Sequence, residues 1–201
     1  MERYTNLDTV LDRVWRRLER AADDSGAAFR TPAFGTVQGN RPHLRTVVLR
    51  VAARAERRLA FHTDRRSQKV EDIRASARVA WHVWDADTSE QVRLCGTATV
   101  HTDDAVADAL WADQDPRSLD VYVRPAPPGT PIDHPDEGID PADAGEAVTR
   151  DDVASGRSHF AVVRTAIDDI DWLHLHPEGH YRARFEYDAD AEAFDGTWIV
   201  P

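Results

Sequence analysis

The feature that most constrains the fold is a change of hydrophobic period near the end of the first 25 residues. Before it, apolar residues recur every three or four positions, the spacing of one face of an α-helix. This face comprises Leu7, Val10, Leu11, Val14, Trp15 and Leu18, and Thr5 or Asn6 can cap its start. After it, short segments rich in Val, Thr and aromatic residues alternate with polar turns, which predicts β-strands. They read TPAFGTVQ, HLRTVVLRVA, RLAFHTD, ARVAWHVWD and EQVRLCGTATVHT.

Two short helices are expected among and after these strands. The segment SQKVEDIRAS places Val70 and Ile73 three residues apart on an apolar edge, with Ser67 as a plausible N-cap. The segment DDAVADALWAD predicts the other helix, with Thr102 or Asp103 as its cap.

Residues 124–158 are dense in proline, glycine and aspartate, which predicts an exposed loop. Four further strand-like segments follow: HFAVVRTA, DIDWLHLH, HYRARFEYD and GTWIVP. A chain of 201 residues suits one domain with its own core. We therefore expect a single mainly β (α+β) domain over residues 1–201, built as a closed antiparallel barrel with an N-terminal helix over 1–25 and a few other peripheral helices.

Composition excludes some functional classes. The net charge of −11 argues against a nucleic-acid binder, which would carry a basic face. A single cysteine, Cys95, rules out an internal disulfide framework, and its apolar-alternating context favours a buried strand residue over a nucleophile. No signal peptide or membrane-spanning stretch is visible, so a cytoplasmic location is expected.

One basic residue stands apart from the others. Lys69 is the only lysine among the 25 lysines and arginines of the chain. It follows the turn RRSQ at the expected start of a helix, where unpaired N–H groups attract anions such as phosphate. The hydroxyl of Ser67, these N–H groups and the Lys69 ammonium are therefore expected to converge on one phosphate. The alternative is that Lys69 is an ordinary solvent-exposed residue in the first turn of a helix and binds no anion.

A neighbouring strand supplies a second cation. In RTVVLR, alternation puts Arg45, Val47 and Leu49 on one face and Thr46, Val48 and Arg50 on the other. An arginine among apolar positions is usually paired or holding an anion. Arg45 is therefore a candidate to complete the phosphate shell.

Taken in order, the run RTVVLR…FHTDRRSQK…EQV resembles the FMN-binding split-barrel family typified by pyridoxamine 5′-phosphate oxidase. That family combines an R-x-V-x-L-[KR] strand, a strand ending in an aromatic residue and Thr, an S-R-K turn, and a later glutamine. Here the glutamine is Gln91, 22 residues after Lys69. The resemblance spans roughly residues 30–201, with 124–158 unmatched, and the ending HYRARFEYD…GTWIVP fits it as well.

The resemblance implies a split barrel that binds FMN between two subunits of a homodimer. It implies that Arg45, Ser67 and Lys69 hold the phosphate, that Gln68 replaces an arginine of the turn, and that Gln91 and Arg184 complete the site. Strand residues that would line the ribityl chain and ring are Thr46, Val47, Val48, Leu49, His62 and Thr63. Where the family has a flavin-contacting tryptophan, this chain offers Leu173 or His174.

The substrate half of the pattern matches less well. The positions that bind the substrate phosphate in the oxidase correspond here to Arg50, Trp111, Asp115 and Ser118, and an aspartate in place of an arginine would repel a phosphate. The family's R-x-H pair becomes His180 and Arg182, in the opposite order. The aromatic residues Trp81, Trp84 and Trp172 exceed the needs of one small core, which also favours a homodimer.

The segment HLHPEGH carries an alternative. His174 and His176 lie two apart and His180 follows a turn, a spacing that also suits metal ligands in a cupin-like enzyme. The cupin pattern needs a glutamate further on than Glu178, so satisfied or partly exposed histidines are preferred and no metal is expected.

The leading hypothesis is an FMN-dependent oxidoreductase acting on an unknown small organic substrate, rather than a true pyridoxamine phosphate oxidase. No catalytic side chain is identified, since the flavin itself carries the hydride or electrons. The alternative is a non-catalytic flavin-binding or flavin-sensing protein, because the same fold serves binding alone.

Overall fold

The computed structural model describes residues 4–133 and 148–201. Its centre is an antiparallel sheet in which the strands follow the order β2-β1-β5-β6-β7-β4-β3, while β8 pairs with β7 and β9. The strands are β1 (Ala33–Gln38), β2 (Arg41–Thr46), β3 (Val51–Ala53), β4 (Arg58–Asp64), β5 (Arg78–Asp85), β6 (Glu90–His101), β7 (Phe160–His174), β8 (Tyr181–Asp188) and β9 (Ala193–Ile199).

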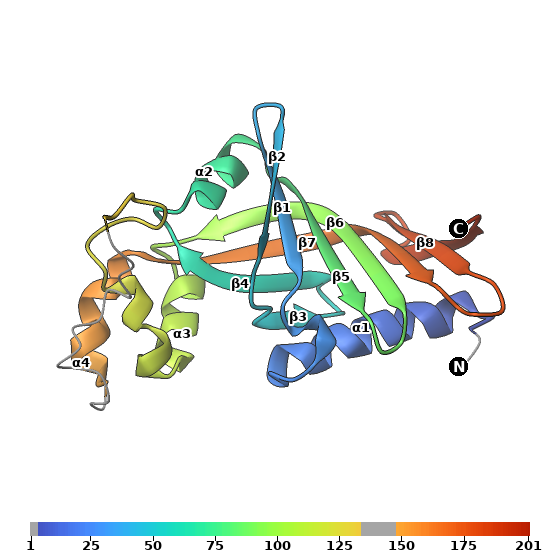
Figure 1. Cartoon of the computed structure of the whole chain (residues 1–201), viewed down its shortest axis with the longest axis horizontal. Helices are drawn as coiled ribbons and strands as arrows, with labels where there is room; N and C mark the ends of the chain where they lie inside the picture. The colour runs from blue at the N-terminus through green and yellow to red at the C-terminus, as the bar shows by residue number, and fades with distance from the viewer. Residues whose placement is uncertain (1–3, 134–147) are drawn as a thin grey trace.

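The helices surround this sheet. Figure 1 shows α1 running along one side of it, α3 and α4 together near one end, and β8 and β9 at the other end. The helices are α1 (Leu7–Asp23), α2 (Gln68–Ala75), α3 (Ala105–Asp113) and α4 (Arg150–Val153), and the 3₁₀ turns are η1 (Ala28–Arg30), η2 (Pro116–Ser118), η3 (Asp120–Tyr122) and η4 (Ala154–Ser158). Within the described parts of the chain, no helix has the length and apolar character to cross a membrane.

The long strand β7 joins the two halves of the sheet. Its first half pairs with β4 and its second half with β8, while β6 pairs with it along nearly its whole length. The sequence predicts two strands here, and the structure has one. The β6–β7 register shifts at Cys95 and Gly96. A Cβ on Gly96 would lie 2.2 Å from the carbonyl oxygen of Ala166, so only glycine fits at this bulge.

The sheet wraps round without closing into a continuous ladder. Its two ends, β2 and β3, are consecutive parts of one extended segment, 41–53. Between them Val47 N donates to Pro32 O and Leu49 N to Arg30 O, whereas Arg50 N turns to Ala60 O of β4. The closed barrel expected from the strand count is thus wrong in this respect, and the split barrel implied by the resemblance is confirmed.

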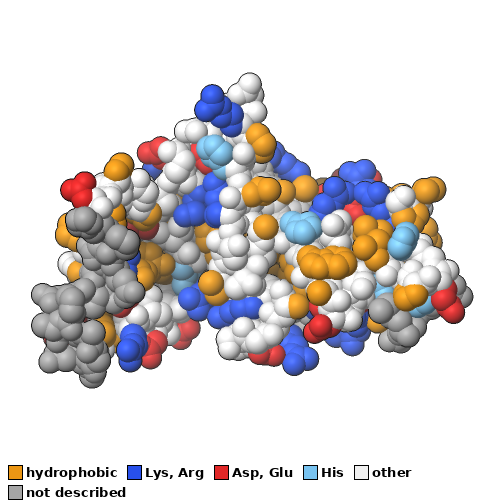
Figure 2. All heavy atoms as spheres, viewed as in Figure 1, with side chains coloured by type: hydrophobic (Ala, Val, Ile, Leu, Met, Phe, Trp, Pro, Cys, Tyr) orange, Lys and Arg blue, Asp and Glu red, His pale blue; other side chains and the backbone are white. Residues whose placement is uncertain are grey.

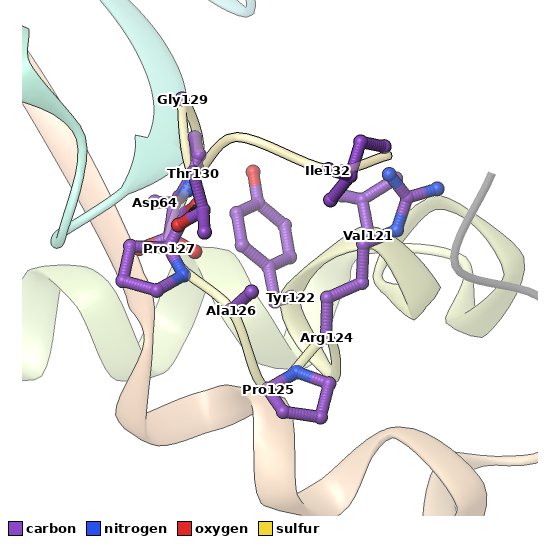
Figure 3. Close-up of a pocket in the computed structure, with 11 residues that line it drawn as sticks. Asp64, Val121, Tyr122, Arg124, Pro125, Ala126, Pro127, Gly129, Thr130 and Ile132 are labelled. Carbon is purple, nitrogen blue, oxygen red and sulfur yellow. Dashed lines mark hydrogen bonds between the residues drawn. The ribbon is translucent and has the colours of Figure 1, made fainter. Parts of the chain in front are cut away.

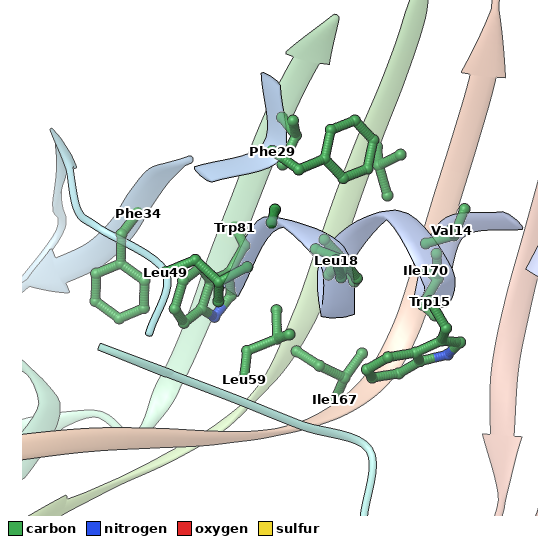
Figure 4. Close-up of a cluster of buried hydrophobic side chains, with 14 of the residues drawn as sticks. Val14, Trp15, Leu18, Phe29, Phe34, Leu49, Leu59, Trp81, Ile167 and Ile170 are labelled. Atoms are coloured by element: carbon green, nitrogen blue, oxygen red, sulfur yellow. The ribbon is translucent and has the colours of Figure 1, made fainter. Parts of the chain in front are cut away.

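The main core lies between α1 and the inner face of the sheet (Figure 4). Val14, Trp15 and Leu18 of α1 are all 1% exposed or less, as their helical spacing predicts. Trp81 and Trp172 are equally buried in this core. They are therefore not interface residues, contrary to the expectation from their number, and each contributes about 1.5–3 kcal/mol by burial.

A second apolar cluster covers the outer face of β4 and β7. Trp111 of α3, Tyr122 of η3 and Phe160 of β7 are its aromatic members, and their rings meet edge to face at 5.1–6.1 Å. Since these residues come from segments far apart in the sequence, this cluster fixes the position of the helical end of the molecule.

The local caps agree in part with expectation. Asn6 caps α1 by accepting from Thr9 N, as one of its two candidates. The cap of α3 is Asp104, which accepts from Val106 N and Ala107 N, and not Thr102 or Asp103. Within the expected loop 124–158, residues 134–147 lie outside the described part, but 150–158 form α4 and η4, so the loop is shorter than expected.

Candidate functional site

The turn between β4 and α2 leaves the start of a helix without a side-chain cap. Ser67 occupies the N-cap position, as predicted, but its Oγ donates to Asp64 O at 2.7 Å instead of accepting from the helix N–H groups. The first N–H groups of α2 therefore remain available to an anion.

Lys69 points back toward the end of β4. Its Nζ donates to Thr63 Oγ1 at 3.0 Å, and that oxygen lies 3.3 Å from Ser67 Oγ. Burial, and then the nearby Arg45, lower the pKa of Lys69, while Asp64 and Asp72 oppose this shift. Among the described residues no carboxylate forms an ion pair with Lys69, so the structure brings three predicted site residues together around an unneutralised ammonium.

Arg45 reaches the same region from β2. Its Nη1 donates to Thr36 Oγ1 at 2.7 Å and to His43 O at 3.1 Å, and its Nη2 lies 3.7 Å from Asp72 Oδ2. Burial lowers the pKa of Arg45, and Asp72 partly offsets this. Asp72 is thus the ion-pair partner of Arg45, and Asp64 is paired with Arg66, so the ammonium of Lys69 leaves a net positive charge at this rim of the sheet.

Asp72 is the residue that sequence reasoning missed. It is buried on α2, accepts from Thr36 Oγ1 at 2.6 Å and lies 3.5 Å from His43 Nδ1. Burial alone would raise its pKa, but hydrogen bonds from Thr36, Gln68 and His43 outweigh that effect and lower it. The i, i+4 spacing of Gln68 and Asp72 was a visible signal, whereas nothing in the sequence connects Thr36 to Asp72.

Gln68 forms its hydrogen bonds with carboxylates of its own helix. Its Nε2 donates to Asp72 Oδ1 at 3.1 Å and to Glu71 Oε2 at 3.2 Å. These hydrogen bonds within the first turn stabilise α2, and the contact of Gln68 with a phosphate stays a prediction.

The segment after Arg45 alternates as the sequence predicts. Val47 and Leu49 are buried, whereas Thr46 and Val48 are exposed on the other face. The backbone of 46–49 follows Arg45 directly along the chain, and its contact with a ribityl chain or ring stays a prediction.

His62 lies near this face beneath the second cluster. Its ring meets Phe160 at 5.0 Å, and its Nε2 is buried with no hydrogen-bond partner among the described residues. Burial, assisted by Arg50, lowers the pKa of His62 to about 4. The imidazole is therefore neutral at pH 7.

Gln91 and Arg184 lie elsewhere in the chain. Gln91 stands opposite Trp84 on the outer face of the sheet, where its Oε1 is 3.2 Å from His82 Nε2. Arg184 donates to Asp169 at 2.8 Å. Arg45 faces the other way, because its ladder partner Phe34 is in the core. One chain therefore does not bring Gln91 or Arg184 to the Lys69 turn.

The predicted substrate residues are dispersed. Trp111 is buried in the second cluster, while Arg50 is close enough to affect both His62 and Tyr122. Arg182 is held by Asp171 at 2.8 Å, and His180 is exposed on a turn.

Two further substrate candidates belong to η2. Asp115 is exposed and caps η2 by accepting from Arg117 N at 2.8 Å, and Ser118 Oγ donates to Asp115 O. Their contact with a substrate phosphate stays a prediction.

Two of the three histidines of HLHPEGH belong to an aromatic cluster. The rings of His174 and His176 are buried 5.4 Å apart, and Tyr181 lies 5.9 Å from His176. Leu173 is half-buried on the opposite face. No group of three His, Cys, Asp or Glu side chains in the described ranges is arranged to hold a metal ion.

The comparisons with known proteins concern the family and the fold. Residues 12–102 match the family model described as pyridoxamine 5′-phosphate oxidase, FMN-binding domain. This match confirms the resemblance read from the sequence. No curated protein matches the chain.

Solved structures share the fold over all or nearly all of the chain. A pyridoxamine 5′-phosphate oxidase-related, FMN-binding protein from Nostoc punctiforme has a TM-score of 0.72 and 24% identity, with 100% of both chains covered. PhzG from Burkholderia lata 383 has a TM-score of 0.65 and 17% identity, with 100% of this chain and 95% of the other covered. A protein related to general stress protein 26 from Clostridium acetobutylicum has a TM-score of 0.54 and 10% identity, covering 94% and 99%.

Proposed function

We propose that this protein binds FMN, with the phosphate at the turn that carries Ser67 and Lys69. The observation that supports this most is that Lys69 forms no ion pair with a described carboxylate: Asp64 is paired with Arg66, and Asp72 lies 3.7 Å from Arg45. A phosphate would neutralise the excess charge and accept from the free N–H groups of α2. The donor set therefore fits the cofactor named by the matching family model.

FMN, when bound, supplies the acceptor or donor of hydride or electrons. The chain's own residues would hold and orient it. Lys69 and Arg45 bind the phosphate, Thr63 orients Lys69 through its hydroxyl, and Asp72 fixes the guanidinium of Arg45. The exposed edge of 46–49 lies next along the strand for the ribityl chain and ring.

The site is proposed to be completed by a second copy of the chain. Gln91 and Arg184 lie away from the Lys69 turn in one subunit, so they reach a shared flavin only across an interface. The outer face of β1, β2 and β5 is suited to such contact, because Leu44 is 74% exposed and Trp84 45% exposed. Figure 2 shows hydrophobic side chains over the middle of this face.

The proposed activity is that of an oxidoreductase with a small organic substrate other than pyridoxamine 5′-phosphate. Of the four positions that correspond to the oxidase's substrate-phosphate site, only Arg50 carries a cation, and the R-x-H pair appears here as His180 and Arg182 in the opposite order. A non-catalytic flavin protein would share the phosphate site and differ in turnover.

The deciding experiment compares FMN with riboflavin, which lacks the phosphate. Titration of purified protein into each flavin, followed by flavin fluorescence, is expected to show clear preference for FMN. Equal affinity would refute the phosphate site. Oxidation of a reduced nicotinamide by the FMN-loaded protein would then support an enzyme, and no turnover with any donor would support the flavin-binding alternative.

A further inference from the structure

A cavity lies beside the turn that is proposed to bind the phosphate. It has a volume of about 420 Å³ and is formed where residues 121–132 fold over the end of β4. This size suits a small organic ligand. Figure 3 shows Tyr122 in the middle of its lining, with Pro127 and Thr130 on one side and Arg124 and Ile132 on the other.

The cavity is tied firmly to the phosphate turn. Arg66 pairs with Asp64 at 2.7 Å and donates to the backbone oxygens of Pro125 and Arg124 at 2.9 and 3.0 Å. Arg66 therefore anchors the arm 121–132 to the turn that carries Lys69. The same contacts neutralise Asp64, the one carboxylate in the lining.

Tyr122 is held in place from behind. Its carbonyl oxygen accepts from His159 Nδ1 at 2.8 Å, and a Cβ on Gly156 would lie 3.0 Å from its backbone. Its ring packs against Phe160, so the hydroxyl is the end that faces the cavity. Burial keeps the pKa of this phenol above its usual range, so the hydroxyl is a neutral donor.

Arg124 is the second unused polar group. Its Nε is buried without a hydrogen-bond partner, and its guanidinium forms no ion pair with any residue in the described ranges. The remaining lining consists largely of apolar side chains: Val121, Pro125, Ala126, Pro127, Pro128 and Ile132. An apolar cavity with one unpaired cation and one neutral donor is complementary to a ligand with an apolar body and a single negative charge.

We propose that this cavity binds a small apolar organic anion, whose charged group pairs with Arg124 and accepts from the Tyr122 hydroxyl. Its body would lie against the prolines and Ile132. Arg50 directly follows the proposed ring lining 46–49 and is close enough to affect Tyr122, so the cavity also offers a place for the substrate of a bound flavin. Only that use rests on the proposed function, and the binding site itself does not.

The test uses two probes of equal shape, 2-naphthoate and its neutral analogue 2-naphthamide, in isothermal titration with flavin-free protein. Naphthoate is expected to bind at least about tenfold more tightly, the effect of one charged hydrogen bond. Arg124→Gln should abolish this preference, and Tyr122→Phe should reduce it. The matched control Arg117→Gln, at an exposed position on η2, should keep it.

A repeat with saturating FMN, and with Lys69→Ala, separates this site from the phosphate site. Naphthoate affinity that survives both supports the cavity whether or not FMN binds. Equal binding of the two probes, no binding of either, or a preference that Arg124→Gln retains would overturn the proposal. So would naphthoate binding that FMN displaces and Lys69→Ala removes.

Discussion

At the scale of single residues, Lys69 is a cation held without a carboxylate partner among the described residues. The Lys69 ammonium donates to Thr63 Oγ1 and lies near Arg45. The pKa of Lys69 is lowered because burial and the nearby guanidinium disfavour its charged form. Burying like charges together is unfavourable unless an anion joins them. The arrangement is therefore best understood as a site prepared for an anion.

Lys69→Ala is expected to weaken FMN binding by about 1.5–3 kcal/mol, the usual worth of a hydrogen bond to a charged group. The measurement is fluorescence titration, with Arg74→Ala as the control because Arg74 is exposed on the same helix. Unchanged affinity for Lys69→Ala would mean that the single lysine is an ordinary helix residue.

His62 gives a prediction about pH. Its pKa falls from 6.5 to about 4 on folding, so the unfolded chain binds more protons between these values. The free energy of unfolding is therefore unaffected by this residue above pH 6.5 and falls as the pH is lowered toward 4, because protonation then favours the unfolded chain. The loss is at most about 3 kcal/mol.

Denaturant unfolding at pH 7, 5.5 and 4 measures this effect. Relative to wild type, His62→Gln should lose less stability over this range, while His180→Gln, at an exposed position, should follow the wild type. Parallel curves for all three proteins would contradict the buried neutral imidazole.

At the scale of elements, the β6–β7 pair depends on one glycine. Gly96→Ala would press a Cβ against Ala166 O, which lies 2.2 Å from the ideal position. We expect the free energy of unfolding to fall by about 1–3 kcal/mol or more, as in overpacked cores. Gly26→Ala is the control, since its Cβ would meet only Asp24 Oδ1 at 3.5 Å. Equal unfolding midpoints in urea would show that the strands shift without cost.

At the scale of the whole molecule, we expect a homodimer with twofold symmetry. Sedimentation should give about twice the 22.6 kDa of one chain, and Trp84→Arg should weaken the association because it charges an exposed apolar position. A monomer at micromolar concentration would count against the shared site.

Subunit mixing tests whether that site is composite. Lys69→Ala and Gln91→Ala proteins are each expected to bind FMN poorly. The two proteins are then unfolded and refolded together, so that mixed dimers form. Each mixed dimer has one site with both residues intact, so about a quarter of all sites should bind FMN tightly if pairing is random. No recovery would place Gln91 outside the site of the partner's Lys69.

The third expectation for the whole molecule concerns the substrate. With FMN loaded, the protein should oxidise pyridoxamine 5′-phosphate far more slowly than a typical turnover of about 1–10 per second. The reason is that, of the four positions matched to the oxidase's substrate-phosphate site, only Arg50 carries a cation here, whereas a doubly charged phosphate needs several. Formation of pyridoxal 5′-phosphate, followed by absorbance, at ordinary enzyme rates would contradict this.

The sequence by itself determined the local features. The split barrel followed from the resemblance of the motif order to a known family, whereas the strand pattern alone favoured a closed barrel. The spacing of Val14, Trp15 and Leu18 predicted α1, and alternation in RTVVLR predicted which residues face the core. These succeed because helix and strand periods are properties of neighbouring residues.

Only the tertiary structure decided which distant residues meet. Asp72 lies near Arg45 because α2 packs against β1. Asp115 caps η2, and Trp81 and Trp172 lie in the core instead of at an interface. The Tyr122 and Arg124 cavity likewise forms because Arg66 fastens a distant arm to the turn. Such contacts depend on packing between segments far apart in the chain, which no local period records.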